Sequence, residues 1–459
     1  MLPLTLLNNL QDVKGFNQQA FEQVHASGEQ VTSIRINTEK VTRENFTSTL
    51  PYWALNNLQP TLVPWCEHGY YLAERPSFTL DPIFHGGAYY VQDASSMFLW
   101  QVLLQTINNT NNKKVLDVCA APGGKSTLLA NYFIDGLIVS NEVIKSRVPV
   151  LVENITKWGA ANVVVTNNDP SHFKSVENYF DLVVVDAPCS GSGLFRKNKD
   201  AIQEWSENNV NLCSQRQQRI VADILPCLKE DGIIIYSTCS YSKEENENTI
   251  DWLMDEFDMV SIPIKIDETW GITETETDKN KASCYRFYPD KVKGEGFFIA
   301  VLAKKGNATD KKLKEQIVQS PTQNELAVLN NFIQLSEEWT LFKHGAELKI
   351  INQQLLSDVK ILANYLYIKK AGVCLGELKG KDIVPNHELA LSTMPLTNIA
   401  TLELSKEDAL QYLRRKEIKT DAAIGWTLIT HKNIRLGWIK VLPNRINNYY
   451  PQEWRIIKN

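Results

Sequence analysis

Two cysteines follow β-rich runs of the chain at points where a strand gives way to a loop. Cys189 stands in VVVDAPCSGSGL (residues 183–194), and Cys239 stands in GIIIYSTCSYS (residues 232–242). A thiol at such a point can act as a nucleophile, bind a metal or fill space as a small apolar group. The eight cysteines include no CxxC pair and no Cys/His cluster with zinc spacing, so we set the metal interpretation aside. We interpret the following as buried or structural side chains: Cys66, Cys213, Cys227, Cys284 and Cys374.

A glycine-rich loop follows the β-rich run VLDV, nearer to the N-terminus. It reads CAAPGGK (residues 119–125) and opens a helix, so its backbone can approach a ligand and the helix N-terminus favours an anion such as a carboxylate. GGKST resembles the end of a phosphate-binding loop, but Cys119 occupies the position where that motif needs a glycine. The dinucleotide pattern GxGxxG is absent as well. Both of these familiar motifs are therefore excluded.

Acidic residues follow the next strands of the same region. Glu142 ends the second predicted strand, Asp169 follows the third, and Asp186 ends the fourth. A carboxylate after the second strand can bind two ribose hydroxyls, and one after the third can accept a hydrogen bond from the amino group of adenine. One such acid alone is better explained as a helix cap, but three at consecutive strand ends beside the glycine loop favour a nucleoside with an amino-acid tail. The cofactor that fits this pattern is S-adenosylmethionine.

The two thiols and Asp186 are expected to converge beside this methyl donor, because neighbouring strand ends lie about 5 Å apart. Such a set suits methylation of a pyrimidine carbon. Carbon 5 of cytosine becomes nucleophilic when a thiolate adds to carbon 6, and an acid that protonates nitrogen 3 assists this addition. The proton on carbon 5 must then leave so that the thiol can be expelled. The local sequence does not decide which cysteine attacks, since both stand on turns whose N–H groups can lower a thiol pKa.

Strand, loop and helix patterns alternate from Lys113 onward. Five β-rich runs, each closing on a turn, predict an α/β fold built on a parallel sheet with helices on both faces. The segment GEGFFIAVLAKK (residues 294–305) alternates like an edge strand and is expected to complete the sheet with a hairpin. Residues 273–283 are predicted to form a solvated loop.

Basic residues are concentrated at the C-terminal end. The net charge of the 459 residues is −5, but residues 411–459 carry ten Lys or Arg against three acids. Aromatic residues are interleaved with these charges, which suits a surface for phosphates and stacked bases. A small β-rich domain with an incidental charge imbalance explains the composition equally well. The aromatic residues concerned are Trp426, Trp438, Tyr449, Tyr450 and Trp454.

The overall composition is that of a globular chain, with 43% hydrophobic and 22% charged residues. No stretch approaches the roughly 18 consecutive apolar residues of a membrane-spanning helix. The start, MLPLTLLNN, lacks a basic segment and a long apolar run, so it does not read as a signal peptide. We therefore expect a cytoplasmic protein whose thiols stay reduced.

The motifs CAAPGGK, DAPCSGSG and STCSY, in this order, resemble those of the Sun family of RNA 5-methylcytosine methyltransferases. The resemblance extends backward to RIN and GAYYVQDASSM and forward to RFYPDKVKGEGFFIA, and it covers nearly all of residues 30–305. The C-terminal stretch IRLGWIKVLPNRINNYYPQEWR resembles the PUA-like tail of the RsmF-like enzymes, the bacterial small-subunit rRNA branch.

The resemblance implies roles for individual positions. It implies that Cys239 attacks carbon 6, that Cys189 helps to break the covalent RNA adduct, and that Asp186 serves the cytosine ring as well as the cofactor. No metal is implied. The positions implied to bind S-adenosylmethionine are Cys119, Ala120, Ala121, Pro122, Gly123, Gly124, Lys125, Glu142, Asp169 and Asp186.

The resemblance also implies a domain order. A Rossmann-like S-adenosylmethionine-dependent methyltransferase sheet is expected between an N-terminal α/β RNA-binding segment and a C-terminal PUA-like β-rich domain. The expected boundaries are 1–105 for the N-terminal segment, 106–306 for the methyltransferase domain, 307–320 for a linker and 321–459 for the C-terminal RNA-binding module. The PUA-like part of that module is expected at about 405–459.

The implied activity is methylation of carbon 5 of cytosine in RNA, with small-subunit rRNA as the expected substrate and the ribosomal subunit as the expected partner. The target base would be flipped out of its stack, and a monomer is expected. The alternatives are the same chemistry on tRNA and a non-catalytic RNA-binding factor in ribosome assembly. One loop departs from the family, because Lys199 stands where proline is usual. Arg196 and Lys197 in this loop fit RNA contact and a solvated loop equally well.

Overall fold

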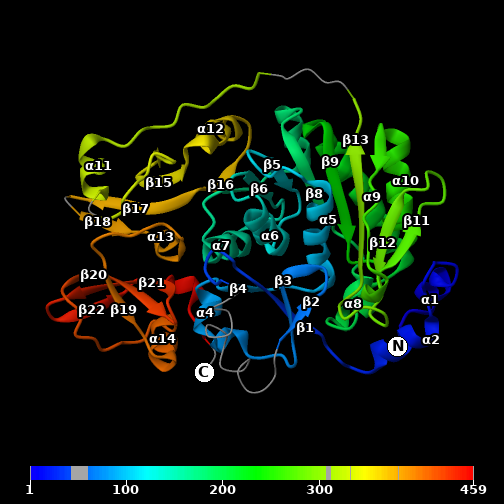
Figure 1. Ribbon diagram of the computed structural model, residues 1–459, viewed down its shortest axis with the longest axis horizontal. Helices are drawn as coiled ribbons and strands as arrows, with labels where there is room; N and C mark the ends of the chain where they lie inside the picture. Colours follow the sequence, from blue (N-terminus) through cyan, green and yellow to red (C-terminus); the bar gives the residue numbers. More distant parts are fainter. Residues whose placement is uncertain (1, 43–59, 307–311, 331, 381, 458–459) are drawn as a thin grey trace.

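The computed structural model describes residues 2–42, 60–306, 312–330, 332–380 and 382–457, and a large mixed β-sheet lies at its centre (Figure 1). The middle of this central sheet runs in the order β9-β8-β5-β6-β7, and all of these neighbours pair in parallel. The predicted parallel sheet is therefore confirmed. Its strands are β5 (Lys114–Asp117), β6 (Leu137–Asn141), β7 (Val163–Thr166), β8 (Phe180–Asp186) and β9 (Leu228–Thr238).

Antiparallel strands extend the sheet beyond β9. β13 (Phe297–Lys304) pairs with β9, and β12 (Ser283–Phe287) forms with β13 the hairpin that the sequence predicts. The expectation of an edge strand is wrong, because β13 lies between β9 and β12 and is buried over most of its length. The prediction of a solvated loop over residues 273–283 is wrong in its first part, since β11 (Thr273–Glu276) pairs with β12. Thr275 on β11 is buried and donates to Glu247, so alternate residues of this polar segment face inward. A short strand, β10 (Met259–Ser261), also pairs with β13.

The strands alternate between two hydrophobic cores, one on each face of the sheet. On β8, Leu182 and Val184 face the first core, and Val183 and Val185 face the second. Such continuous apolar strands are typical of parallel sheets that helices cover on both sides. The first core includes residues of α5 (Phe98–Thr106), α6 (Gly124–Tyr132) and α7 (Val148–Trp158). The second includes residues of α9 (Glu207–Ile224) and α10 (Glu247–Glu256).

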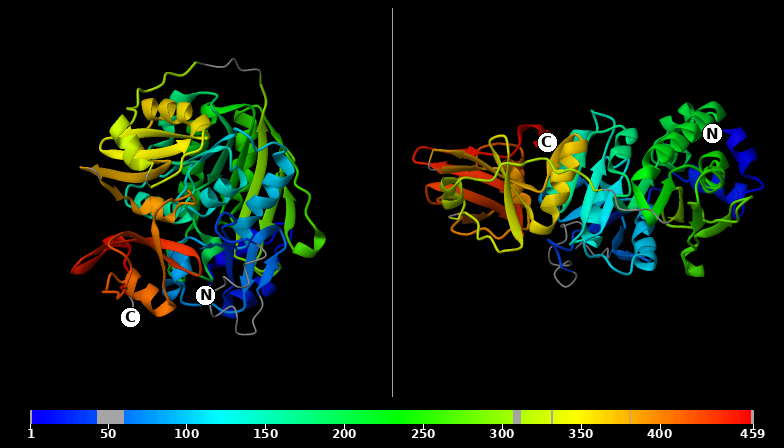
Figure 2. Two further views of the ribbon diagram at one scale, coloured as in Figure 1. Left: turned by 60° about the vertical axis from the view of Figure 1, so that its left-hand side comes forward. Right: turned by 90° about the horizontal axis from the view of Figure 1, so that it is seen from above.

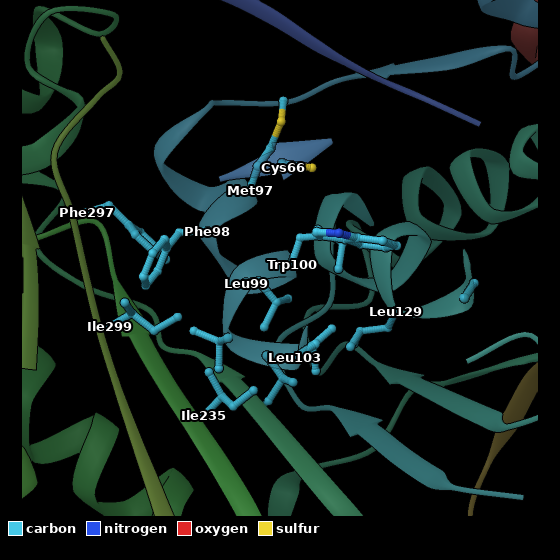
Figure 3. Close-up of a cluster of buried hydrophobic side chains, with 14 of the residues drawn as sticks. Cys66, Met97, Phe98, Leu99, Trp100, Leu103, Leu129, Ile235, Phe297 and Ile299 are labelled. Atoms are coloured by element: carbon cyan, nitrogen blue, oxygen red, sulfur yellow. The ribbon is translucent and has the colours of Figure 1, made fainter. Parts of the chain in front are cut away.

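Figure 3 shows part of the first core, in which side chains of α5 lie beside Ile235 of β9 and Ile299 of β13. Cys66 lies at its edge, and burial raises the pKa of its thiol to about 11. Cys213, Cys227, Cys284 and Cys374 are buried too, which agrees with their interpretation as apolar side chains.

An N-terminal sheet packs beside the first core. Its strand order is β2-β3-β1-β4, and all of its pairs are antiparallel. Arg35 on β1 reaches from this sheet to α6 and donates to the Gly124 carbonyl and the Thr127 hydroxyl. The elements of this part are α1 (Leu4–Leu10), α2 (Gln18–Ala26), β1 (Thr32–Ile36), β2 (Thr61–Val63), β3 (Cys66–Leu72), α4 (Pro82–His85) and β4 (Tyr89–Val91).

The C-terminal part contains two further sheets. The first has the order β14-β15-β17-β18 and the second the order β19-β20-β21-β22. Seen from above, this part (yellow to red) lies beside the cyan half of the central region (Figure 2). The strands are β14 (Trp339–His344), β15 (Glu347–Asn352), β17 (Val373–Lys379), β18 (Asp382–Pro385), β19 (Ala400–Glu403), β20 (Gly425–His431), β21 (Ile434–Leu442) and β22 (Arg445–Asn448). The helices are α11 (Gln323–Leu329), α12 (Leu356–Tyr365), α13 (His387–Leu391) and α14 (Lys406–Leu413).

One strand of the C-terminal part belongs to the central sheet. β16 (Ile368–Ala371) pairs antiparallel with the edge strand β7 and closes that edge. Its neighbour Tyr367 accepts a backbone bond from Asn167 at 3.1 Å and donates one to the Asn168 side chain at 3.0 Å. The expected linker 307–320 is described only from residue 312, and its first part lies outside the described residues. Within the described ranges, no helix is long and apolar enough to cross a membrane.

The ion pair between Glu247 and Arg286 lies wholly inside the protein and connects α10 to β12. We expect Glu247→Gln to destabilise the protein by about 3–5 kcal/mol, because it leaves the guanidinium buried without its counter-charge. Asp255 lies on the same helix in an exposed pair with Lys279, so Asp255→Asn is a matched control with a much smaller expected cost, because water screens exposed pairs. Urea unfolding of both variants measures this, and equal costs would contradict the prediction.

Candidate active site

The glycine loop lies at the carboxyl end of β5, where the sequence places it. Gly123 has a φ of +116°, a conformation that favours glycine, and it starts α6. The loop is held from behind by its neighbours. Asn154 of α7 donates to the Pro122 carbonyl at 2.8 Å, and Arg147 donates to the Ala121 carbonyl at 2.5 Å. Ala120 donates its backbone N–H to Asn141 at 2.8 Å.

Arg35 anchors the same loop from the N-terminal sheet. Its side chain is buried, donates to Gln92 at 2.8 Å and Thr127 at 2.6 Å, and lies over the ring of Trp158. Burial lowers the pKa of Arg35 to about 10. The RIN segment that resembles the family therefore has a structural task, since it connects the N-terminal sheet to the first turn of α6.

Glu142 and Asp169 follow β6 and β7 at the same edge of the sheet. Glu142 accepts from the N–H of Ile144 at 2.8 Å, and its other oxygen lies 3.3 Å from Arg147. Asp169 caps the following helical turn, η4 (Pro170–Val176), by accepting from the N–H of Ser171 at 3.0 Å and from its hydroxyl at 2.7 Å. These hydrogen bonds hold the pKa of Asp169 below its usual range. Asp169 therefore caps this turn, as a strand-end acid can, and its residue is still partly exposed.

Asp186 ends β8 and lies opposite the glycine loop. Lys125 Nζ lies 2.8 Å from one carboxylate oxygen of Asp186, and Ser237 donates to the other at 2.8 Å. The Lys125 ammonium also lies over the ring of Phe297. These contacts join the loop after β5 to the ends of β8 and β9, so the expected cofactor residues and the cysteines share one edge.

The two cysteines meet, as the sequence predicts. Their sulfur atoms are 2.9 Å apart, with Cys189 three residues beyond the end of β8 and Cys239 one residue beyond the end of β9. The hydrogen bond with Cys239 raises the pKa of Cys189 well above its ordinary value, and burial raises it further. Cys119 is the first residue of the glycine loop, and burial likewise raises the pKa of its thiol.

The glycines of DAPCSGSG bring the two cysteine loops together. Gly193 donates to the carbonyl of Cys239 at 2.8 Å and accepts from the N–H of Gly296 at 3.1 Å. A Cβ on Gly193 would lie 2.4 Å from the carbonyl oxygen of Gly296 and 2.8 Å from that of Cys239. Gly191 has a φ of +75°, the left-handed conformation that lets the chain turn between the two serines.

The loop after the first cysteine motif is not solvated at its start. Arg196 is buried and pairs with Glu295, donating to both of its oxygens at 3.1 Å and to the Gly294 carbonyl at 2.8 Å. Neither earlier interpretation of Arg196 fits this position, because the guanidinium is used inside the fold. Lys197 is partly exposed and pairs with Asp93 at 2.8 Å. Lys199 precedes the short helix α8 (Asp200–Glu204), so the residue that replaces proline does not interrupt an element.

Sequence reasoning missed two residues that hold this edge. Arg147 links Glu142 to the glycine loop, and Asp117 at the end of β5 accepts from Ser126 at 2.7 Å. One oxygen of Asp117 is buried without a hydrogen-bond donor in the described part of the chain, whereas the second oxygen of Glu142 has only the Arg147 guanidinium beside it, at 3.3 Å. An unfilled acceptor beside a glycine cradle fits a ligand that carries hydroxyl or amino donors. Asp117 could have been found from the sequence, because it is an acidic residue at the end of a strand and close to the glycine loop.

Burial raises the pKa of Asp117 to about 7 from an ordinary value of 3.8. Between about pH 4 and pH 7 the folded state therefore binds more protons than the unfolded state, and stability falls as the pH rises through this window, by up to about 4 kcal/mol. We expect Asp117→Asn to remove this part of the fall, with the exposed Asp135→Asn as control. Urea unfolding at several pH values measures it. A wild-type pH dependence in Asp117→Asn would contradict the assignment.

Comparison with known proteins gives three matching family models. Residues 104–303 match "16S rRNA methyltransferase RsmB/F", residues 2–94 match "N-terminal domain of 16S rRNA methyltransferase RsmF", and residues 400–456 match "Methyltransferase RsmF PUA domain". The chain is 31% identical to a ribosomal RNA small subunit methyltransferase F of Psychromonas ingrahamii, over 92% of this chain and 90% of that protein. It is 29% identical to the corresponding protein of Shewanella piezotolerans, with the same coverage.

A solved structure of a methyltransferase homolog from Pyrococcus horikoshii is similar over 66% of this chain and all of that one, with a TM-score of 0.53 and 29% identity. The match over 92% of the chain agrees with the order of the motifs that resemble this family. The chain therefore belongs to the RsmB/F family of 16S rRNA methyltransferases.

Proposed function

We propose that this protein transfers a methyl group from S-adenosylmethionine to carbon 5 of cytosine in 16S rRNA, through a covalent bond between Cys239 and the base. One observation carries the chemistry, namely the two thiols 2.9 Å apart beside the glycine loop. Methylation of a pyrimidine carbon needs a nucleophile and a second acid–base group within reach of one ring. Membership of the RsmB/F family supports RNA as the substrate and S-adenosylmethionine as the methyl donor.

The chain's own residues suit the cofactor. The N-terminus of α6 faces the place where the carboxylate of the cofactor would lie, and Gly123 leaves room for it. Glu142, which Arg147 and the N–H of Ile144 hold in place, would accept from the ribose hydroxyls, and Asp169 would face the adenine. When bound there, the cofactor supplies an electrophilic methyl group. We propose that the residues that bind the cofactor are Cys119–Lys125, Glu142, Asp169 and Asp186.

Cys239 is the better nucleophile of the pair. The hydrogen bond between the two sulfur atoms and burial both raise the pKa of Cys189, which favours Cys189 as the thiol and Cys239 as the nucleophile of the pair. Cys239 then adds to carbon 6 as the thiolate, and the negative charge of the ring collects at nitrogen 3. Asp186 is already paired with Lys125 at 2.8 Å, so the proton that moves to nitrogen 3 comes from the Lys125 ammonium, which Asp186 holds in place.

Release of the product uses Cys189. Once Cys239 is bonded to carbon 6, Cys189 lies beside the adduct, within reach of the reacting ring, where it can act as the base of the release step. Cys189 gives its proton to solvent and takes the proton of carbon 5, while the electrons of that C–H bond expel Cys239 from carbon 6. The proton on nitrogen 3 returns to the Lys125–Asp186 pair. The reaction thus releases one proton overall.

The C-terminal part offers a surface for the RNA around the target base. An open cavity of about 670 Å³ is lined by Arg415, Lys416, Arg445 and Tyr449, among others. Cations beside an exposed aromatic ring suit backbone phosphates and stacked bases. We infer that the substrate is met in the cytoplasm, on the small ribosomal subunit, by a single copy of this chain.

We expect Cys239→Ala to abolish methylation, because the alanine cannot activate carbon 5. Bisulfite sequencing of rRNA and tRNA, from cells lacking this protein and complemented with either form, measures the loss and identifies the RNA class. Cys374→Ala, which changes a buried cysteine in β17, is the control and should restore methylation. Methylation by Cys239→Ala at a near wild-type rate would overturn the nucleophile, and restored marks in tRNA alone would overturn rRNA as the substrate.

We expect Cys189→Ala to accumulate a protein–RNA adduct that survives denaturation, since attack and methyl transfer proceed and release fails. The adduct should form only with S-adenosylmethionine present, and it should be absent from the double variant that also carries Cys239→Ala. Denaturing gel electrophoresis with labelled RNA measures it. Normal turnover without an adduct would remove the release role from Cys189 and leave the role of Cys239 untouched.

A further inference from the structure

A single buried carboxylate connects the two cysteine loops. Each cysteine is followed by a serine, and both serine hydroxyls donate to the same oxygen of Glu245, Ser190 at 2.5 Å and Ser240 at 2.5 Å. The two hydroxyls lie 3.2 Å from each other. Distances this short are typical of hydroxyls that donate to a charged acceptor. Glu245 lies on the turn η7 (Lys243–Glu245), just after the second cysteine loop.

The second oxygen of Glu245 holds the first cysteine loop from its other side. It accepts from the N–H of Ser190 at 2.7 Å and from the side chain of Gln217 at 3.2 Å. The same amide of Gln217 donates to the carbonyl of Pro188 at 3.1 Å. Cys189 is therefore held on both sides, because Pro188 bonds to Gln217 and Ser190 bonds to Glu245. The Tyr236 hydroxyl lies within hydrogen-bond distance of two acceptors, the Glu245 carbonyl at 2.7 Å and the Gln217 side-chain oxygen at 2.9 Å, and its one hydrogen ties the two residues together.

The Glu245 side chain is held by hydrogen bonds alone in the described part of the chain. Other buried carboxylates of this region pair with arginines, Glu247 with Arg286 and Glu295 with Arg196, whereas the described contacts of Glu245 are the four hydrogen bonds from Ser190, Ser240 and Gln217. Burial raises the pKa of Glu245, and the hydrogen bonds from both serines oppose that rise. A buried carboxylate costs free energy unless each of its oxygens has its hydrogen-bond donors. The donors to Glu245 include the two serines that follow the paired cysteines.

We infer that Glu245 is a positioning residue that holds Cys189 and Cys239 in contact by accepting from the serine that follows each of them. This inference rests on the proposed roles of the two cysteines. A carboxylate accepts four hydrogen bonds through two oxygens, whereas the amide of glutamine presents one oxygen and an NH2 group. In Glu245→Gln, either the two hydroxyls or the Ser190 N–H and Gln217 face a donor instead of an acceptor. One cysteine loop then loses its attachment while the packing volume stays the same.

The distance between the thiols can be tested without RNA. Diamide is an azo compound that takes up two hydrogens as two thiols form a disulfide, and peptide mass spectrometry measures the rate at which Cys189 and Cys239 join. We expect Glu245→Gln to slow this reaction about tenfold or more, because a displacement near 1 Å is large for reacting groups. Glu244→Gln, which changes the preceding carboxylate, should react at the wild-type rate. An unchanged rate in Glu245→Gln overturns the inference, whether or not the protein methylates RNA.

Steady-state methylation then separates positioning from a general structural role. We expect Glu245→Gln to lower kcat about tenfold or more, with KM for RNA and the Kd of S-adenosylmethionine each within about twofold. Adding Ser190→Ala and Ser240→Ala to Glu245→Gln should lower kcat little further, since the three residues act as one unit. Equal losses in cofactor affinity and kcat, or additive losses in the combined variant, would overturn the inference. If Glu245→Gln does not fold, the Ser190→Ala/Ser240→Ala variant takes its place in both experiments and must show the same two effects.

Discussion

The parallel pairing of β8 with β9 is the constraint on which the proposed active site depends. Their register places Asp186 opposite Ser237, so the two chains leave the sheet side by side at the spacing of hydrogen-bonded strands, about 5 Å. Cys189 and Cys239 are therefore brought into contact by the sheet and not by a local motif. The same register places Ser237 where it donates to Asp186. A shift of one residue would turn the strands' apolar side chains away from their cores, so packing on both faces secures the geometry of the site.

Other parts of the chain stabilise this edge from outside the central sheet. Arg35 of the N-terminal sheet bonds to the first turn of α6, and β16 of the C-terminal part closes the edge beside Asp169. Ile434 of β21 packs in the same cluster as Ile34 and Ile36 of β1, so the last sheet of the chain contacts the first. The N-terminal and C-terminal parts therefore contact each other as well as the central region.

Much of the fold followed from local patterns. Apolar runs that close on turns predicted β5 to β9 because each strand is buried on both faces, and period-two alternation predicted the hairpin of β12 and β13. The prediction failed where side chains were polar. Thr273–Glu276 reads as a loop, yet it forms β11, since its threonines find buried partners such as Glu247. The pairing of β16 with β7 could not be predicted from local patterns either, because these residues are about 200 positions apart in sequence and meet only in the folded chain.

The sequence by itself determined the chemistry on offer: a glycine loop, acids at successive strand ends, and two cysteines after adjacent strands, each recognisable from residue type and spacing. Only the tertiary structure decided how these groups are used. It buried Arg196 against Glu295, paired Asp186 with Lys125, and gathered four donors around Glu245. The physical reason is that charge and hydrogen bonding depend on distance and burial. Those quantities belong to residues far apart along the chain, and local patterns carry no record of them.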